Sequence, residues 1–197
     1  MFSLTFMKEV FLSNRSTGAV SPSSRQLAER ITDLAEISGN KIIVEYGPGT
    51  GVFTEVIQRK KDPDAIFFAM EVNDAFVEVT RKRCPGVTVY HDCAQNTFNY
   101  VKDAGAEQCD LIISGLPWTR FPGALQDEIL ESTFKVLRPG GKFLTFGYTF
   151  SPLMPSGRAF FCHKLPDKFG KVTRSSVIWQ NFPPCHVYIA QKAADAT

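Results

Sequence analysis

The sequence predicts a doubly wound α/β fold with a terminal antiparallel hairpin and an N-terminal helical extension. Between residues 41 and 148, short β-rich runs alternate with helical stretches, a pattern typical of parallel strands joined by crossover helices. Near the C-terminus, two β-rich runs are separated only by "NFPP", which predicts a hairpin. With 197 residues, 44% of them hydrophobic, the chain can bury one full core.

Two helices are expected before the first strand, and they form an extension over residues 1–38. Residues 2–12 place apolar side chains near one helical stripe and predict an amphipathic helix. A second helix is expected to begin with Ser21 as N-cap and Pro22 as its first helical residue, and to stop at Gly39. Residues 39–197 then form the main domain.

The elements of that domain follow in a regular order. Strands are expected at 41–46, 65–71, 87–92, 110–115 and 142–148. Helices are expected between them, at 51–60, 73–83, 94–103 and 123–137. The runs at 171–180 and 185–192 form the hairpin.

Composition excludes several broad classes of function. The 22 basic and 20 acidic residues nearly balance, so no chain-wide positive field favours nucleic acid. The five cysteines contain no CxxC pair, no cleavable signal is evident, and the three histidines have no zinc-motif spacing, which predicts a cytoplasmic protein without a metal site. No uncharged apolar run approaches the roughly 18 residues of a membrane span, so any membrane contact is expected to be peripheral.

A glycine-rich stretch, "VEYGPGTG", directly follows the first predicted core strand. Its spacing is E-x-G-x-G-x-G, from Glu45 through Gly47, Gly49 and Thr50 to Gly51. Glycines permit backbone angles closed to other residues and let a ligand approach the main chain. The dinucleotide pattern needs a third glycine where this chain has Val52, so a cofactor other than NAD is favoured. The alternative is a tight turn with purely structural glycines.

This stretch resembles motif I of class I S-adenosylmethionine-dependent methyltransferases. The resemblance implies a Rossmann-like seven-stranded sheet, S-adenosylmethionine as cofactor and S-adenosylhomocysteine as product. Glu71 ends the second strand, where a carboxylate can accept hydrogen bonds from ribose hydroxyls. Asp92 follows the third strand and resembles the residue that contacts the adenine amino group, or else it caps the helix near Ala94. The segment "VLRPGGKFLTF" extends the resemblance to about residue 148.

The acceptor is expected to bind at "ISGLPW", after the fourth strand. This segment resembles the N-L-P-Y motif of amino-group methyltransferases, but Gly115 stands in place of Asn, or Ser114 if the register shifts by one. Pro117 and Trp118 keep the turn and the aromatic ring, and Trp attracts an alkylammonium. An aliphatic amine therefore fits better than a flat base. Trp118 could instead be a lid or core residue, and Tyr46 could either place its hydroxyl near the amine or fill the core.

The N-terminal stretch "FLSNRSTGAVSPSSRQLA", residues 11–28, is followed by the motifs "VEYGPGTGVFT" and "SGLPW". Together they resemble the bacterial phospholipid N-methyltransferase family, which is related to the rRNA adenine dimethylases. The resemblance implies methylation of the amine of phosphatidylethanolamine or a methylated derivative, with an N-terminal amphipathic helix docked on an anionic membrane surface at the cytoplasmic face. No nucleic acid partner is expected. Alternatives are a helix that packs on the sheet edge, an rRNA adenine dimethylase-like or small-molecule amine methyltransferase, and a non-catalytic cofactor-binding protein.

A basic segment between the fifth strand and the hairpin is expected near the pocket mouth. Arg158 is the expected phosphate ligand in it, because a guanidinium can bind two oxygens at once. The other basic residues of this segment are Lys164, Lys168, Lys171 and Arg174. Tyr148 is expected to line the substrate site. The alternative is a solvated loop, and the oligomeric state stays open.

Overall fold

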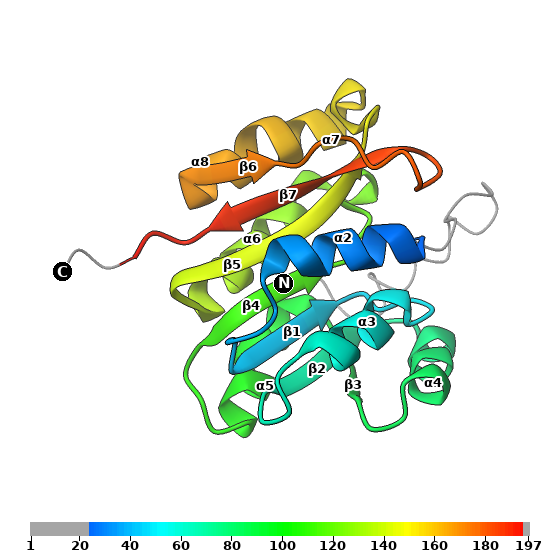
Figure 1. The fold of residues 1–197 in the computed structure, drawn as a ribbon. Helices are drawn as coiled ribbons and strands as arrows, with labels where there is room; N and C mark the ends of the chain where they lie inside the picture. The colour runs from blue at the N-terminus through cyan, green and yellow to red at the C-terminus, as the bar shows by residue number, and fades with distance from the viewer. Residues whose placement is uncertain (1–23, 195–197) are drawn as a thin grey trace.

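The computed structural model describes residues 24–194, so the expected helix at residues 2–12 lies outside the described part. A seven-stranded sheet crosses the molecule in the order β3-β2-β1-β4-β5-β7-β6 (Figure 1). The strands are β1 (Ile42–Tyr46), β2 (Ile66–Glu71), β3 (Thr88–His91), β4 (Cys109–Ser114), β5 (Leu137–Tyr148), β6 (Lys171–Arg174) and β7 (Cys185–Gln191). The first five are parallel, and β7 runs antiparallel to both β5 and β6, which confirms the predicted fold.

Helices cover both faces of the sheet. The helices α2 (Arg25–Ala35) and α3 (Val52–Lys60) pack on one face, and α4 (Asp74–Arg83) packs against β2 and β3. On the other face lie α5 (Thr97–Asp103), preceded by the 3-10 turn η2 (Ala94–Asn96), and α6 (Gly123–Val136) (Figure 1). The two main clusters of buried apolar side chains fill the spaces between these helices and the sheet, which holds the strand ends in fixed positions.

The start of α2 differs from the prediction. The helix begins at Arg25, and Ser24 is its N-cap, since its hydroxyl accepts a hydrogen bond from the Leu27 amide at 3.1 Å. The expected cap at Ser21 is therefore wrong. The helix also ends earlier than expected, because Glu36 adopts a left-handed conformation with φ of 55°.

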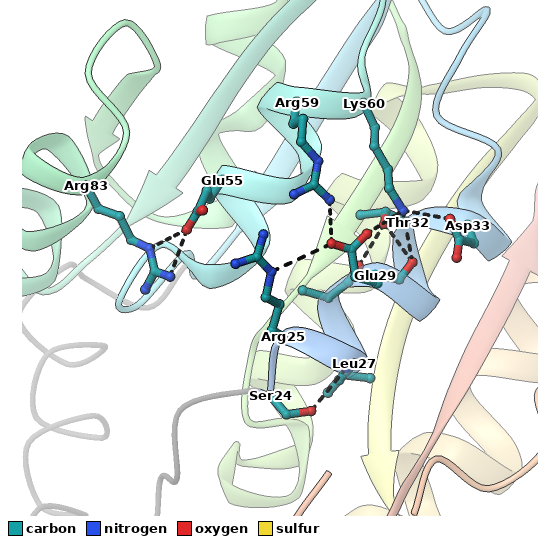
Figure 2. Close-up of polar contacts among 11 residues, drawn as sticks. Ser24, Arg25, Leu27, Glu29, Thr32, Asp33, Glu55, Arg59, Lys60 and Arg83 are labelled. Atoms are coloured by element: carbon teal, nitrogen blue, oxygen red, sulfur yellow. Dashed lines mark hydrogen bonds and ion pairs between the residues drawn. The ribbon is translucent and has the colours of Figure 1, made fainter. Parts of the chain in front are cut away.

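Ion pairs attach α2 to α3 (Figure 2). Lys60 lies 2.8 Å from Glu29 and 2.6 Å from Asp33, and Arg59 pairs with the same Glu29 carboxylate. The hydrogen bonds from Lys60 and Arg59 lower the pKa of Glu29 to about 2. A second pair, Arg83 with Glu55, joins α4 to α3 (Figure 2). The helices around the glycine loop thus form one connected layer.

The Pro-Gly-Gly segment lies inside the fifth strand, although the strand is expected to begin only at residue 142. β5 begins at Leu137, directly after α6, and includes Pro139, Gly140 and Gly141. Its register against β4 shifts, because Cys109 pairs with Leu137 whereas Leu111 pairs with Lys142. The extra residues therefore bulge out of the sheet before regular pairing starts.

The segment between β5 and β6 is helical, which the sequence analysis did not predict. It contains the 3-10 turn η4 (Ser151–Leu153), α7 (Pro155–Ala159), the π-helical turn η5 (Phe160–Lys164) and α8 (Leu165–Phe169). Phe160, Phe161, Leu165 and Phe169 are buried on the sheet. Within residues 24–194, no helix has both the length and the apolar character needed to cross a bilayer.

Candidate active site

The glycine loop connects the end of β1 to the start of α3. Gly47, Gly49 and Gly51 have φ values of 65°, 57° and 79°, which L side chains rarely adopt. The Gly47 amide donates to the Met70 carbonyl at 2.9 Å, and the Thr80 hydroxyl donates to the Gly49 carbonyl at 2.9 Å. The Thr50 carbonyl accepts from Arg83 at 3.2 Å. The loop is thus fixed by β2 and α4, and Gly47, Gly49 and Thr50 are partly exposed.

Glu71 lies beside this loop at the end of β2. One carboxylate oxygen accepts from the Gly49 amide at 3.2 Å, and the other accepts from the amides of Val72 and Asn73 at 2.9 and 3.0 Å. Burial raises the pKa of Glu71, and these three amides act in the opposite direction. The structure therefore brings Glu71 and the glycine loop together, as the sequence predicts.

Glu45 points to the opposite side of β1 from Tyr46, toward α3. It is fully buried, and within the described chain neither carboxyl oxygen has a hydrogen-bond partner, although the equally unpaired Thr54 hydroxyl is near. Burial raises the pKa of Glu45 to about 8, and the Glu71 carboxylate adds to this. An unpaired buried carboxyl group next to the glycine loop fits a cofactor that carries positive charge.

Asp92 follows β3 on the same edge of the sheet. Its carboxylate accepts hydrogen bonds from the Cys93 amide at 2.7 Å, the Asn96 side chain at 2.9 Å and the Tyr100 hydroxyl at 2.8 Å. The 3-10 turn that starts at Ala94 has Cys93 as N-cap, with no side-chain cap bond, so the alternative role of Asp92 as the N-cap is wrong. Asp92 is partly exposed and lies at the same sheet edge as Glu71.

The loop after β4 comes very close to the glycine loop. The Gly115 amide donates to the Tyr46 carbonyl at 2.8 Å, and a Cβ atom at Gly115 would lie 2.7 Å from the Gly47 carbonyl oxygen. Position 115 therefore accepts only glycine without a shift of the backbone. Ser114 is fully buried, and its hydroxyl accepts from the Leu116 amide at 3.3 Å. Neither position offers an amide side chain to a substrate.

Trp118 and Tyr46 are both buried on the α6 side of the sheet. The Trp118 ring is stacked on Phe160 with a centroid distance of 4.1 Å, and its Nε1 donates to the Thr145 hydroxyl at 3.0 Å. The Tyr46 hydroxyl lies 2.9 Å from the Thr97 hydroxyl within the core, and burial raises its pKa. The geometry of Tyr46 agrees with the core alternative, not with a hydroxyl at the acceptor amine.

A cavity of about 60 Å³ lies where β4 and β5 end, large enough for a few water molecules or a small amine headgroup. Among residues 24–194, no acidic side chain lines it. It is lined by the loop after β4, the end of β5 and two residues of the helical segment that follows: Gly115, Leu116, Pro117, Trp118, Thr119, Arg120, Phe146, Gly147, Tyr148, Ser151 and Phe161. The predicted residues Gly115, Pro117, Trp118 and Tyr148 thus meet at one cavity.

The positive charge at this cavity comes from Arg120, which the sequence analysis missed. Arg158 is exposed on α7 and does not line the cavity. Lys164 pairs with Asp127 at 2.7 Å and Lys168 pairs with Glu131, so these two lysines bind α6. In the described part of the chain, no group of three or more His, Cys, Asp or Glu side chains could hold a metal ion.

Replacing Gly147 with alanine is expected to impair the acceptor side alone. The new Cβ atom would lie 2.7 Å from the Phe161 ring, which is held between Tyr188 and Phe160. Such overpacking costs about 1–3 kcal/mol of stability and distorts the cavity wall. We expect a lower methylation rate with unchanged cofactor affinity, measured by turnover and calorimetry. Gly123→Ala, which meets only the flexible end of Lys164, is the control. A loss of cofactor affinity as large as the loss of methylation rate would contradict an effect confined to the acceptor cavity.

Comparison with known proteins agrees with this arrangement. Residues 44–145 match the family described as Methyltransferase domain. The chain is 26% identical over 187 residues to an ornithine lipid N-methyltransferase of Singulisphaera acidiphila, covering 83% of this chain and 97% of that protein. It is 24% identical over 145 residues to ribosomal RNA small subunit methyltransferase A of Thermotoga maritima, covering 66% of this chain but 49% of that protein.

A solved structure shows the same fold. The O-methyltransferase from Bacillus cereus in complex with S-adenosylhomocysteine superposes with a TM-score of 0.66 at 16% identity, and the match covers 93% of this chain and 90% of that one. The family match spans more than half of this chain and includes the glycine loop, Glu71, Asp92 and the loop after β4. The chain therefore belongs to the class I S-adenosylmethionine-dependent methyltransferases.

Proposed function

We propose that this methyltransferase transfers methyl groups to the amine of phosphatidylethanolamine, or a methylated derivative of it, at a membrane surface. The cavity at the ends of β4 and β5 carries the proposal. Position 115, where amino-group methyltransferases of the N-L-P-Y type have an amide side chain, has no room for a Cβ atom. The wall is otherwise mostly apolar and aromatic, which suits an aliphatic amine that gains positive charge as it is methylated better than a nucleobase.

The relatives support a lipid acceptor over RNA. The relative named for an ornithine lipid is matched over 97% of its length, whereas the ribosomal RNA methyltransferase is matched over 49%. The near balance of 22 basic and 20 acidic residues also disfavours RNA. Ornithine lipid is the second candidate acceptor, because it is the substrate in that relative's name.

The cofactor side has the groups that S-adenosylmethionine requires. We assign the ribose hydroxyls to Glu71, the adenine amino group to Asp92 and the amino acid end of the cofactor to the loop from Gly47 to Gly51 through Thr50. Glu45 lies behind this loop, and positive charge on the bound cofactor would favour the ionised form of its buried carboxyl group. When bound, the cofactor supplies a methyl group on a sulfonium, which a lone pair can displace in line.

The acceptor side would hold a neutral amine and its phosphate. Arg120 can bind phosphate oxygens, and its positive charge disfavours the ammonium form of an amine in the cavity. Burial raises the pKa of Tyr148, so its phenol stays neutral and can accept a hydrogen bond from the amine. The amphipathic segment 2–12 is proposed to dock on anionic lipid at the cytoplasmic face of the membrane.

The direct test is methyl transfer from labelled S-adenosylmethionine to phosphatidylethanolamine vesicles, with and without anionic lipid. Ornithine lipid vesicles, RNA and soluble ethanolamine serve as parallel acceptors. We expect label in phosphatidylethanolamine, with more on anionic vesicles. Label only in ornithine lipid would identify ornithine lipid as the acceptor in place of phosphatidylethanolamine. Label only in RNA or ethanolamine would contradict a lipid acceptor. Cofactor binding without any product would indicate a non-catalytic protein.

A further inference from the structure

Five large apolar side chains are exposed on two loops of the molecule. Leu153, Phe182 and Trp179 are 85%, 83% and 73% exposed, more than any other large apolar side chain in residues 24–194. Phe150 and Met154 are also exposed. We call these five residues the apolar rim. Apolar groups of this size, gathered in one place on a surface, mark a site of contact with another molecule or a membrane.

The two loops are neighbours in space. The first loop follows β5, and the second connects β6 to β7. The end of β5 pairs with the start of β7 through Tyr148 and Cys185. The Thr149 amide donates to the Pro184 carbonyl at 2.9 Å, which joins the loops directly. A bridge between Ile178 and Cys185 closes the turn that carries Trp179 and Phe182. Figure 1 shows this turn beside the carboxyl end of β5.

The apolar rim borders the acceptor cavity. Tyr148 and Ser151 line the cavity, and the Tyr148 ring is stacked on Phe150 with a centroid distance of 5.4 Å. Leu153 lies two residues after Ser151. The start of α2 meets the second loop, because the Ser24 amide donates to Asn181 at 3.0 Å. A molecule that covered the rim would therefore lie next to the cavity and to the beginning of α2.

The charge pattern of these loops favours a membrane as this molecule. Residues 143–157 and 175–185 contain no Asp, Glu, Lys or Arg, whereas Arg158 directly follows the first stretch and Arg174 directly precedes the second. Uncharged loops can enter the boundary between headgroups and acyl chains, and cations at their edges can meet anionic phosphates. Trp is enriched at this boundary, because its ring is apolar and its N–H is polar.

We propose that the apolar rim docks on the headgroup boundary of an anionic phospholipid bilayer and holds the acceptor cavity against it. The choice of a bilayer, in preference to a protein, rests on the proposed lipid acceptor. Docking by the rim is separate from any contribution of residues 2–12, since it depends on side chains at the end of β5 and in the β6–β7 turn.

Trp179 gives a residue-specific test. The chain has two tryptophans, of which Trp118 is buried and Trp179 is exposed. Vesicles of phosphatidylcholine with phosphatidylglycerol should shift Trp179 emission to shorter wavelength, and brominated lipid should quench it. Trp179→Phe should abolish both changes. Vesicle binding without a change in Trp179 emission would overturn the proposal and assign binding to other residues.

Variants separate docking from catalysis. Leu153→Ala, Trp179→Ala and Phe182→Ala combined should lower vesicle partitioning at least tenfold, with unchanged thermal unfolding and unchanged methylation of a short-chain lipid below its micelle concentration. Val79→Ala with Phe98→Ala, two exposed apolar residues on α4 and α5, should leave partitioning unchanged. Equal partitioning of both variants would overturn the proposal.

The remaining outcomes distinguish the two proposals and the other possible occupants. If vesicles shift the Trp179 emission of the wild-type protein while no lipid is methylated, this outcome would support docking by the apolar rim and contradict the proposed acceptor. A dimer in sedimentation that the triple variant makes monomeric, without any vesicle effect, would assign the rim to a second copy of the chain. Trp179 emission already at short wavelength without vesicles would mean that the protein itself covers the rim.

Discussion

Replacing Glu71 with alanine is expected to raise the dissociation constant for S-adenosylmethionine about a hundredfold. Hydrogen bonds to a charged group contribute about 1.5–3 kcal/mol each, and the carboxylate can accept one from each ribose hydroxyl. Loss of about 2.7 kcal/mol corresponds to a hundredfold change in the dissociation constant. Calorimetric titration of cofactor into wild type and variant measures the effect directly.

Glu71 also holds the protein's own backbone, so the experiment needs a matched control. The carboxylate accepts from the amides of Gly49, Val72 and Asn73, and alanine would leave all three without this partner. Glu71→Gln keeps one acceptor oxygen and should show a smaller loss, of about tenfold. Thermal unfolding without cofactor shows how much of the effect comes from the loop. Unchanged cofactor affinity in Glu71→Ala would remove Glu71 from the site.

The strands and the cofactor edge of this fold could be predicted because the determining signals are local. β-rich runs of the right length fix the strands, and glycines that need positive φ fix the turn after β1. Since parallel strands end at one edge of the sheet, Glu71 and Asp92 follow at once as neighbours of that turn. Each of these inferences needs only a short stretch of sequence.

Other features depend on contacts that no short stretch contains. Serines at positions 21, 23 and 24 can each cap a helix, and the bond between the Ser24 amide and Asn181, 157 residues away, accompanies the choice of Ser24. The helical turns from Ser151 to Phe169 are too short to show a period, and Pro155 and Pro166 lie at the starts of α7 and α8. The burial of these turns depends on the stacking of Phe160 on Trp118 and of Phe161 on Tyr188.

The lining of the cavity agrees only in part with the residues expected at the acceptor site. The motif "ISGLPW" contributes to the loop that lines the cavity, whereas Arg158, the expected phosphate ligand, does not line it and Arg120 does. Arg120 lines the cavity because the 3-10 turn η3 (Trp118–Arg120) is part of the loop that follows β4. The requirement for glycine at position 115 likewise arises from the Gly47 carbonyl of a distant loop.

Trp118→Ala is expected to have the largest effect on stability of any single change at the site. The side chain is 1% exposed, stacked on Phe160 and in edge contact with Phe121 and Phe143. Truncation of such a ring costs about 3–5 kcal/mol, a large part of the 5–15 kcal/mol that typically stabilises a domain. Urea unfolding measures this loss, and a loss below 1 kcal/mol would contradict the packing described.

A catalytic contribution of Trp118 must therefore be tested with milder changes. Trp118→Phe keeps the stack on Phe160 but loses the hydrogen bond from Nε1 to Thr145. Thr145→Val keeps the indole but loses this bond and the bond from its own hydroxyl to the Ser114 carbonyl. Each lost hydrogen bond should cost about 1 kcal/mol. If the indole contacts the acceptor amine, Trp118→Phe should lower turnover well beyond Thr145→Val at equal cofactor affinity, because Phe attracts a cation less strongly than Trp. Equal turnover in the two variants would make Trp118 a packing residue, and the cavity would then hold the amine through Tyr148 and the backbone of the loop after β4.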